Sequence, residues 1–147
     1  MDEPPVFPRL LEQAGYQVSY TGKWHLGNAV IHDWFAQSCG YDTKAYSAWC
    51  KEHGLEDGWA FNDYAVRSHR PPHMSIPIPM EMKLAPENYG DAWITNKAID
   101  AIRNRDPEKP FFAVCSWNGP HPPFKIPEPY LSMYQSIAEQ IPCPPNF

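Results

Sequence analysis

The chain has 147 residues, enough for one domain with a core but too few for two. A composition of 43% apolar and 14% aromatic residues excludes an intrinsically disordered chain. A net charge of −5 without any run of Lys or Arg argues against a nucleic-acid-binding surface, and no apolar stretch approaches the ~20 residues that span a bilayer.

The amino-terminal segment predicts a helix followed by a strand. Its acidic, proline-rich start has no basic segment and no apolar run, so we expect no signal peptide here, and the compartment stays open. Residues 8–14 begin with a proline, place leucines on one face and stop at Gly15, as a short helix does. Residues 16–22 alternate aromatic or apolar with polar side chains, the pattern of a strand.

Residues 28–86 are the least regular part of the chain. The sequence contains 18 prolines, more than twice the average share of ~5%, so we expect long irregular connections. Short helical pieces are expected within residues 31–55. The prolines of residues 70–86 exclude a regular helix there and predict an extended surface excursion.

The four cysteines form no C-x-x-C pair, so a zinc site of that type is not indicated. We expect four free thiols, with Cys115 buried. A bridge between Cys39 and Cys50 would require an oxidising compartment, and Cys143 lies near the end of the sequence.

The last third predicts a helix, a strand and a short helix. Residues 87–105 carry apolar side chains at i, i+4, i+7 and i+8, which is the spacing of one buried stripe. These are Ile94, Ala98, Ala101 and Ile102. Residues 111–117 are nearly continuously apolar, which predicts a strand covered on both faces. A loop and a short helix over residues 127–140 come next, and residues 141–147 are irregular.

This order of elements is that of a β–α–β unit with an enlarged connection, which gives parallel strands. Ligands of parallel sheets bind outside the carboxyl ends of the strands. Lys23 and His25 come after the first strand and His121 after the second, so we expect the three side chains to converge at one edge. One ammonium and two imidazoles could hold the oxygens of a sulfate or phosphate ester and protonate its leaving oxygen.

Each of these residues also has an ordinary structural interpretation. A lysine after a strand is usually a solvated surface charge, which would suffice for Lys23. His25 lies between Trp24 and Leu26 and could cap an edge of the core, while the prolines beside His121 could require only a rigid turn. Spacing alone leaves both interpretations open.

Two separated segments carry a resemblance to a known family. "LLEQAGYQVSYTGKWHLG" is similar to a signature segment of the sulfatases, in the alkaline-phosphatase superfamily, and "KPFFAVCSWNGPHPPF" is similar to a later segment of that family. Between them, "ENYGDAWITNKAIDAI" resembles the family's helix before the second strand. "YLSMYQ" and "PCPPN" resemble the segments that come after that strand in the family. The resemblance covers roughly residues 4–27 and 84–147.

The resemblance implies roles for the same three residues. Lys23 would bind the sulfate group, His25 would assist a formylglycine nucleophile, and His121 would contact the sulfate and help the leaving oxygen. In this family a hydrated formylglycine attacks sulfur, and a calcium ion neutralises the sulfate oxygens. The implied fold is α/β, a partial parallel or mixed sheet flanked by helices, and the implied substrate is a small sulfate ester.

The sequence departs from the family at the nucleophile and the metal. No Cys/Ser-x-Pro-x-Arg motif occurs: residues 75–79, "SIPIP", lack the arginine, and residues 143–145 fail as well. The family's calcium-binding acidic segments are also missing, so no metal ligand is assigned. We therefore expect a single incomplete catalytic domain over residues 1–147, with the helix and strand before "GKWHLG" in residues 1–27, a variable excursion over residues 28–86, and the remaining elements in residues 87–147.

Without nucleophile and cation, we expect the isolated chain to have little or no turnover, and exposed sheet edges to promote self-association. Two alternatives stay open: a phosphoester or phosphonate hydrolase of the same superfamily, and a non-catalytic remnant. Aryl, choline and carbohydrate sulfates are equally open as substrates. Aromatic and basic residues of the excursion could line a specificity pocket or simply pack onto the domain: Tyr41, Trp49, Trp59, Phe61, Arg67, His69 and Arg70.

Overall fold

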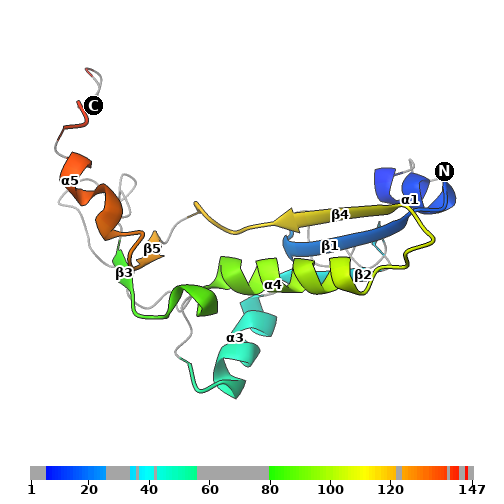
Figure 1. Cartoon of the computed structure of the whole chain (residues 1–147), viewed down its shortest axis with the longest axis horizontal. Helices are drawn as coiled ribbons and strands as arrows, with labels where there is room; N and C mark the ends of the chain where they lie inside the picture. Colours follow the sequence, from blue (N-terminus) through cyan, green and yellow to red (C-terminus); the bar gives the residue numbers. More distant parts are fainter. Residues whose placement is uncertain are drawn as a thin grey trace.

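The computed structural model describes residues 6–25, 34–35, 37–41, 43–55, 80–121, 124–138, 140–142 and 145. Three parallel strands form the main sheet in the order β2-β1-β4 (Figure 1). They are β1 (Gln17–Lys23), β2 (Gln37–Tyr41) and β4 (Phe111–Ser116). A second parallel pair joins β3 (Met80–Met82) to β5 (Lys125–Pro127) at the other end of the molecule. The predicted α/β class, with parallel strands flanked by helices, is confirmed.

Two helices, α1 and α4, lie on opposite faces of the main sheet. Leu11 of the first helix packs near β1, and the longest helix, α4, runs alongside β1 and β4 (Figure 1). The helical elements are α1 (Phe7–Gln13), α3 (Thr43–Glu52), η3 (Pro86–Asn88), α4 (Gly90–Arg103), η4 (Ser132–Tyr134) and α5 (Gln135–Ala138). The predicted helix over residues 8–14 and strand over residues 16–22 are each found within one residue of their expected bounds.

The single helix predicted over residues 87–105 is wrong in two respects. Tyr89 is extended, with ψ 148°, so η3 and α4 are separate, and α4 begins where the Tyr89 carbonyl accepts a hydrogen bond from the Trp93 N–H at 2.9 Å. The buried stripe also ends early, since Ile94 is fully buried but Ile102 is 46% exposed. Trp93 and Ile94, near the start of α4, are buried with Tyr46 and Cys50 of α3, and α4 also packs on β1 and β4.

Two apolar clusters hold the sheet. The first is built on Val18, Tyr20 and Phe35, which share one face of β1 with partly buried side chains of β4 and α1. The second joins α3 to α4 on the other side: Tyr46, Cys50, Trp93 and Ile94. Since β1 is hydrogen-bonded on both edges and covered on both faces, its five inner residues are buried. Burial of such side chains stabilises a fold by roughly 25 cal/mol per Å² of apolar area.

β4 is less covered than the sequence predicts. Its residues are half-buried and Ala113 is exposed, because within the described part of the chain β4 has a hydrogen-bonded neighbour only on its β1 side. Cys115, predicted to be buried, is likewise half-buried. The Cys50 thiol is buried and takes no part in a disulfide bond, so no bridge to Cys39 forms in this structure.

β2 is a strand that the sequence pattern did not indicate. Its residues, "QSCGY", show no apolar alternation, and pairing with β1, from Ser19 opposite Gln37 to Lys23 opposite Tyr41, gives them a strand conformation.

Much of the excursion predicted over residues 28–86 lies outside the described residues. So do the side chain of Tyr41 and five other specificity candidates: Trp59, Phe61, Arg67, His69 and Arg70. Trp49 is described, and it packs on Tyr46 at 6.0 Å between ring centroids.

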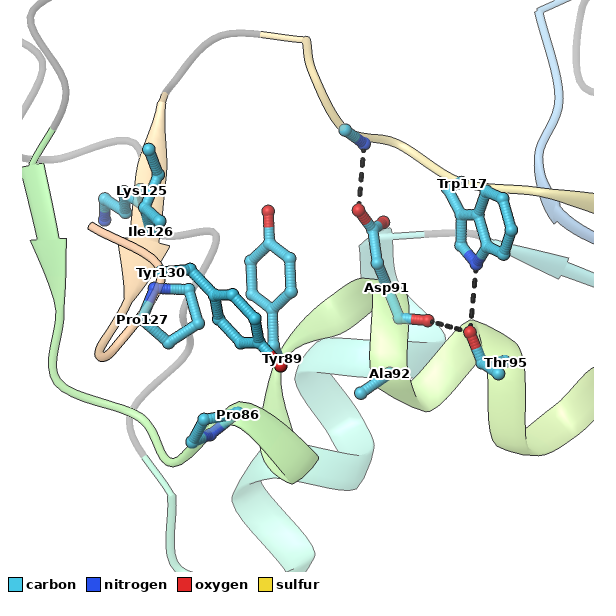
Figure 2. A pocket seen from close by; sticks show the side chains of 11 residues that line it. Pro86, Tyr89, Asp91, Ala92, Thr95, Trp117, Lys125, Ile126, Pro127 and Tyr130 are labelled. Carbon is cyan, nitrogen blue, oxygen red and sulfur yellow. Dashed lines mark hydrogen bonds between the residues drawn. The ribbon is translucent and has the colours of Figure 1, made fainter. Parts of the chain in front are cut away.

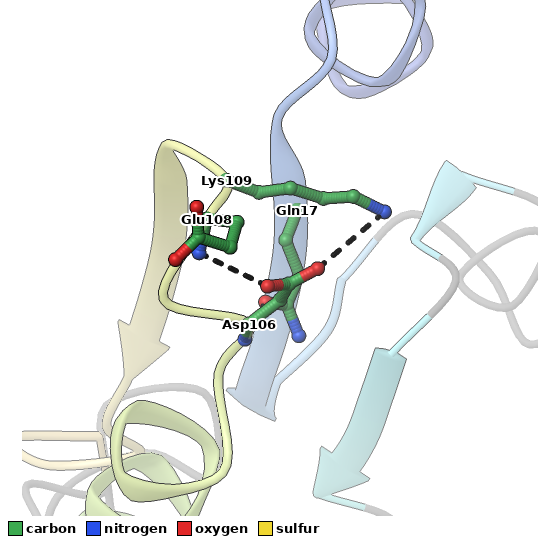
Figure 3. A network of polar contacts seen from close by, with 4 residues as sticks. All are labelled: Gln17, Asp106, Glu108 and Lys109. Atoms are coloured by element: carbon green, nitrogen blue, oxygen red, sulfur yellow. Dashed lines mark hydrogen bonds and ion pairs between the residues drawn. The ribbon is translucent and has the colours of Figure 1, made fainter.

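A polar network fixes the starting ends of β1 and β4 (Figure 3). The Gln17 N–H donates to the Pro110 carbonyl at 2.9 Å, and the Gln17 side-chain oxygen accepts from the Asp106 N–H at 2.7 Å. The Asp106 carboxylate accepts from the Glu108 N–H at 3.0 Å and lies 3.8 Å from the Lys109 ammonium. The ion pair is exposed and adds little to stability. The hydrogen bonds fix the register at which β1 and β4 begin.

Gly22 fixes the other end of the same strand pair. Its φ is +105°, and a Cβ at this position would lie 1.9 Å from the Ser116 carbonyl oxygen and 3.0 Å from a methyl group of Ile94. The contact with the Ser116 oxygen is shorter than any real side chain tolerates, and the contact with Ile94 is tighter than most. Only glycine therefore lets β1, β4 and α4 approach each other this closely, one residue before Lys23.

We expect Gly22→Ala to destabilise the full-length protein by at least about 3 kcal/mol, because it adds a backbone clash to an unfavourable φ. Gly15→Ala is the matched control: its φ is +87°, but nothing lies within 4 Å of the added Cβ, so it should cost only about 1 kcal/mol. Urea unfolding of both variants measures the difference. Equal losses would show that the close approach at Gly22 is unimportant.

Candidate functional site

Lys23 is the last residue of β1, and the turn after it is held by aromatic packing. Its carbonyl oxygen accepts a hydrogen bond from the Tyr20 hydroxyl, and its side chain is half-buried. The Trp24 ring packs edge-on against Tyr20 at 5.1 Å and Trp34 at 5.4 Å. His25, the next residue, has an exposed side chain. The strand end thus presents a half-buried cation next to an exposed imidazole.

His121 lies in a turn that begins where β4 ends. Its N–H donates to the Asn118 carbonyl at 3.0 Å, which closes the turn, and its side chain is exposed. Gly22 pairs with Ser116 in the parallel register, so Lys23 and the turn after Ser116 leave the same edge of the sheet. The predicted parallel arrangement of the two strands is confirmed. Convergence of all three side chains on one anion stays a prediction.

Asp91, in the first turn of α4, fastens this turn to the helix (Figure 2). Its Oδ1 accepts from the Asn118 N–H at 2.9 Å, and its Oδ2 accepts from the Gly119 N–H at 3.1 Å. A second link lies one turn along α4, where the Thr95 hydroxyl accepts from the Trp117 indole N–H at 2.9 Å and donates to the Asp91 carbonyl at 2.7 Å. The sequence pattern does not indicate this contact of Asp91.

A pocket of about 420 Å³ opens beside this turn (Figure 2). Trp117 and Gly119 of the turn contribute to one wall, and β5 with the segment after it forms another. Apart from Asp91, Thr95, Lys125 and Gly119, the lining is aromatic, aliphatic or proline: Pro86, Tyr89, Ala92, Trp117, Ile126, Pro127 and Tyr130. Such a mixture of apolar walls with a few polar groups is typical of small-molecule sites.

The electrostatics of the pocket are dominated by burial and by Asp91. Burial, and secondly the charge of Asp91, raises the pKa of Tyr89 to about 12. The same two causes, in the same order, raise the pKa of the Cys115 thiol. The phenol and the thiol are therefore neutral near pH 7 and can act as hydrogen-bond donors.

The described residues do not fit the calcium ion that the family resemblance implies. Within them, no group of three or more His, Cys, Asp or Glu side chains is close enough to hold a metal ion. Both carboxylate oxygens of Asp91 already face backbone N–H donors.

In the ranges that the structure covers, no helix has the length and apolar character to cross a bilayer.

Comparison with known protein families matches the chain to "Sulfatase" over residues 1–142. The fold is thus that of an α/β protein of the alkaline-phosphatase superfamily. Within that superfamily, the chain belongs to the sulfatase family.

Individual relatives agree with the family match. The chain is 27% identical over 135 residues to an uncharacterized sulfatase of Schizosaccharomyces pombe, covering 91% of this chain and 24% of that protein. It is 41% identical over 71 residues to an arylsulfatase of Clostridium perfringens, covering 48% and 14%. It is 30% identical over 115 residues to an N-acetylglucosamine-6-O-sulfatase of Bacteroides thetaiotaomicron, covering 78% and 16%. The matched part thus spans a quarter or less of each of these relatives.

The raised pKa of Tyr89 predicts a loss of stability at alkaline pH. The phenol of Tyr89 stays protonated in the native state at pH values where the unfolded phenol, with its pKa of 10.0, is ionised. The contribution of Tyr89 to native-state stability is therefore complete below pH 10 and is lost as the pH rises toward about 12. Tyr89→Phe cannot ionise, so its unfolding free energy should fall less steeply over this window. Urea unfolding of both proteins at stepped pH measures the two slopes, and identical slopes would contradict the assignment.

Proposed function

We propose that this chain supplies the sulfate-binding and proton-transfer residues of a sulfuric ester hydrolase. The observation that carries the proposal is the parallel pairing of β1 with β4, because Lys23 is the last residue of β1, His25 lies just after it, and the turn of His121 follows the same end of β4. Membership of the sulfatase family supports the reaction class. The relatives named as sulfatases support it further.

The roles of the three residues follow from their chemistry. The Lys23 ammonium has three N–H donors and a fixed positive charge for the sulfate oxygens. As the ester S–O bond breaks, His121 gives a proton to the departing oxygen, so the product leaves as a neutral alcohol. His25 assists the attacking group by accepting a proton. Overall, ester and water become alcohol and hydrogen sulfate.

The attacking group is not among these 147 residues. No Cys/Ser-x-Pro-x-Arg motif occurs in the sequence, so we propose that residues 1–147 alone have little or no turnover. We also propose that, in isolation, they associate through the half-covered β4 edge. Catalytic tests therefore belong in the full-length gene product, supplied with calcium.

The proposed substrate is a small organic sulfate ester. The pocket beside the His121 turn supports this, since its aromatic and proline walls suit the ring of an aryl or sugar group while the sulfate lies toward the strand ends. Turnover of a chromogenic aryl sulfate, with the matching aryl phosphate in parallel, tests the reaction class. Preference for the phosphate would instead favour a phosphoester hydrolase.

Lys23→Ala should lower kcat/KM for an aryl sulfate by about 100-fold or more, because it removes a charged donor from a developing anion. Lys51→Ala is the control: Lys51 is exposed at the end of α3 and should leave the rate unchanged. Steady-state kinetics of the purified full-length variants measure both. Wild-type kcat/KM in Lys23→Ala would contradict the role of Lys23.

His121→Ala should slow alkyl sulfates by about 10²- to 10⁴-fold and nitrophenyl sulfate much less, because only a poor leaving group needs a proton. His53→Ala, at an exposed histidine after α3, is the matched control and should slow neither ester. The ratio of the two esters' kcat values is the measurement. An equal loss on both esters would argue against proton donation by His121.

A further inference from the structure

We infer that Asp91 is a positioning residue that holds the His121 turn in its working geometry, an inference that rests on the proposed function. It accepts the two consecutive N–H groups of Asn118 and Gly119, at 2.9 and 3.1 Å, through separate carboxylate oxygens. His121 is closed onto the same turn by its own N–H bond to the Asn118 carbonyl. A displacement of the Asp91 carboxylate would thus be passed to the histidine through two hydrogen-bonded steps.

Asp91 belongs to a well-packed part of α4. Asp91 lies in the first turn of α4, two and three residues before Trp93 and Ile94, which are 5% and 0% exposed in the second cluster. Thr95 adds a link on the other side of the turn, because its hydroxyl bonds both to the Asp91 carbonyl and to the Trp117 indole. The turn is therefore held to the buried part of the helix at two places (Figure 2).

Gly119 shows that the turn is shaped around the carboxylate. A Cβ at Gly119 would lie 2.7 Å from Oδ2 of Asp91, closer than a real Cβ approaches any atom. Glycine at this position is what lets the backbone N–H reach the carboxylate. A side chain at this position would therefore push the Asp91 carboxylate away from the N–H groups that it accepts.

The charge of Asp91 suits positioning better than contact with an anionic ester. Two N–H donors occupy its oxygens, and hydrogen bonds to an ionised acceptor are about twice as strong as neutral ones. An amide side chain has only one acceptor oxygen, so Asp91→Asn loses one of the two bonds and turns an NH₂ group toward a backbone N–H. The variant keeps the shape of the side chain but not its function as a double acceptor.

The test compares Asp91→Asn with Asp100→Asn, an exposed carboxylate on the same helix, in the full-length protein. We expect Asp91→Asn to lower kcat by about 10- to 100-fold with little change in KM, and to slow alkyl sulfates more than nitrophenyl sulfate, as His121→Ala does. The double variant, Asp91→Asn with His121→Ala, should have almost the same kcat as His121→Ala alone, because both changes act on the same proton donor. Asp100→Asn should match the wild type.

Amide hydrogen exchange of the segment 117–121 gives a readout that does not depend on activity. Asp91→Asn should speed exchange at Asn118 and Gly119, whereas Asp100→Asn should not. Unchanged exchange, or losses that add fully to those of His121→Ala, would overturn the inference about Asp91. Wild-type rates in both Lys23→Ala and His121→Ala would instead overturn the proposed function, and the two failures are therefore distinguishable.

Discussion

The close approach of β1 to β4 at Gly22 is the constraint on which the carboxyl edge of the sheet depends. A Cβ at residue 22 would lie 1.9 Å from the Ser116 carbonyl oxygen, so the two strands can pack this closely only if residue 22 is glycine. At the opposite end, the Gln17 hydrogen bonds set where both strands begin. With the pair fixed at both ends, Lys23 and the turn after Ser116 leave the sheet together.

The second support of the site is α4. Trp93 and Ile94 in its first turns are buried in the cluster shared with α3, so this end of the helix is well packed. From this position the Asp91 carboxylate accepts the backbone N–H groups of Asn118 and Gly119 rather than binding a ligand. Its charge also acts at a distance, since it contributes to the raised pKa values of Tyr89 and Cys115. The pocket that Tyr89 lines thus holds a neutral phenol, and the adjacent edge of the sheet carries the Lys23 cation.

The elements with strong periodicity could be predicted from the sequence, and those without it could not. The first helix, β1 and β4 were each predicted within one residue, because leucine spacing, alternation and a continuous apolar run are local signals. β2 has no such signal and exists because β1 offers it a hydrogen-bonding edge. The predicted burial of Ile102, Cys115 and both faces of β4 was wrong, because burial depends on which elements lie opposite, and periodicity does not report that.

The sequence by itself determined the family, through "GKWHLG" and the later "PFF" and "PH" segments, and it determined which chemical groups come after the two strands. Tertiary structure alone decided how those groups are supported. Asp91 lies 27 and 28 residues from the N–H groups that it accepts, and Gly22 meets a strand 94 positions further along the chain (Gly22 to Ser116). Contacts at such separations leave no periodic pattern, because they depend on the parallel crossover that brings distant segments together.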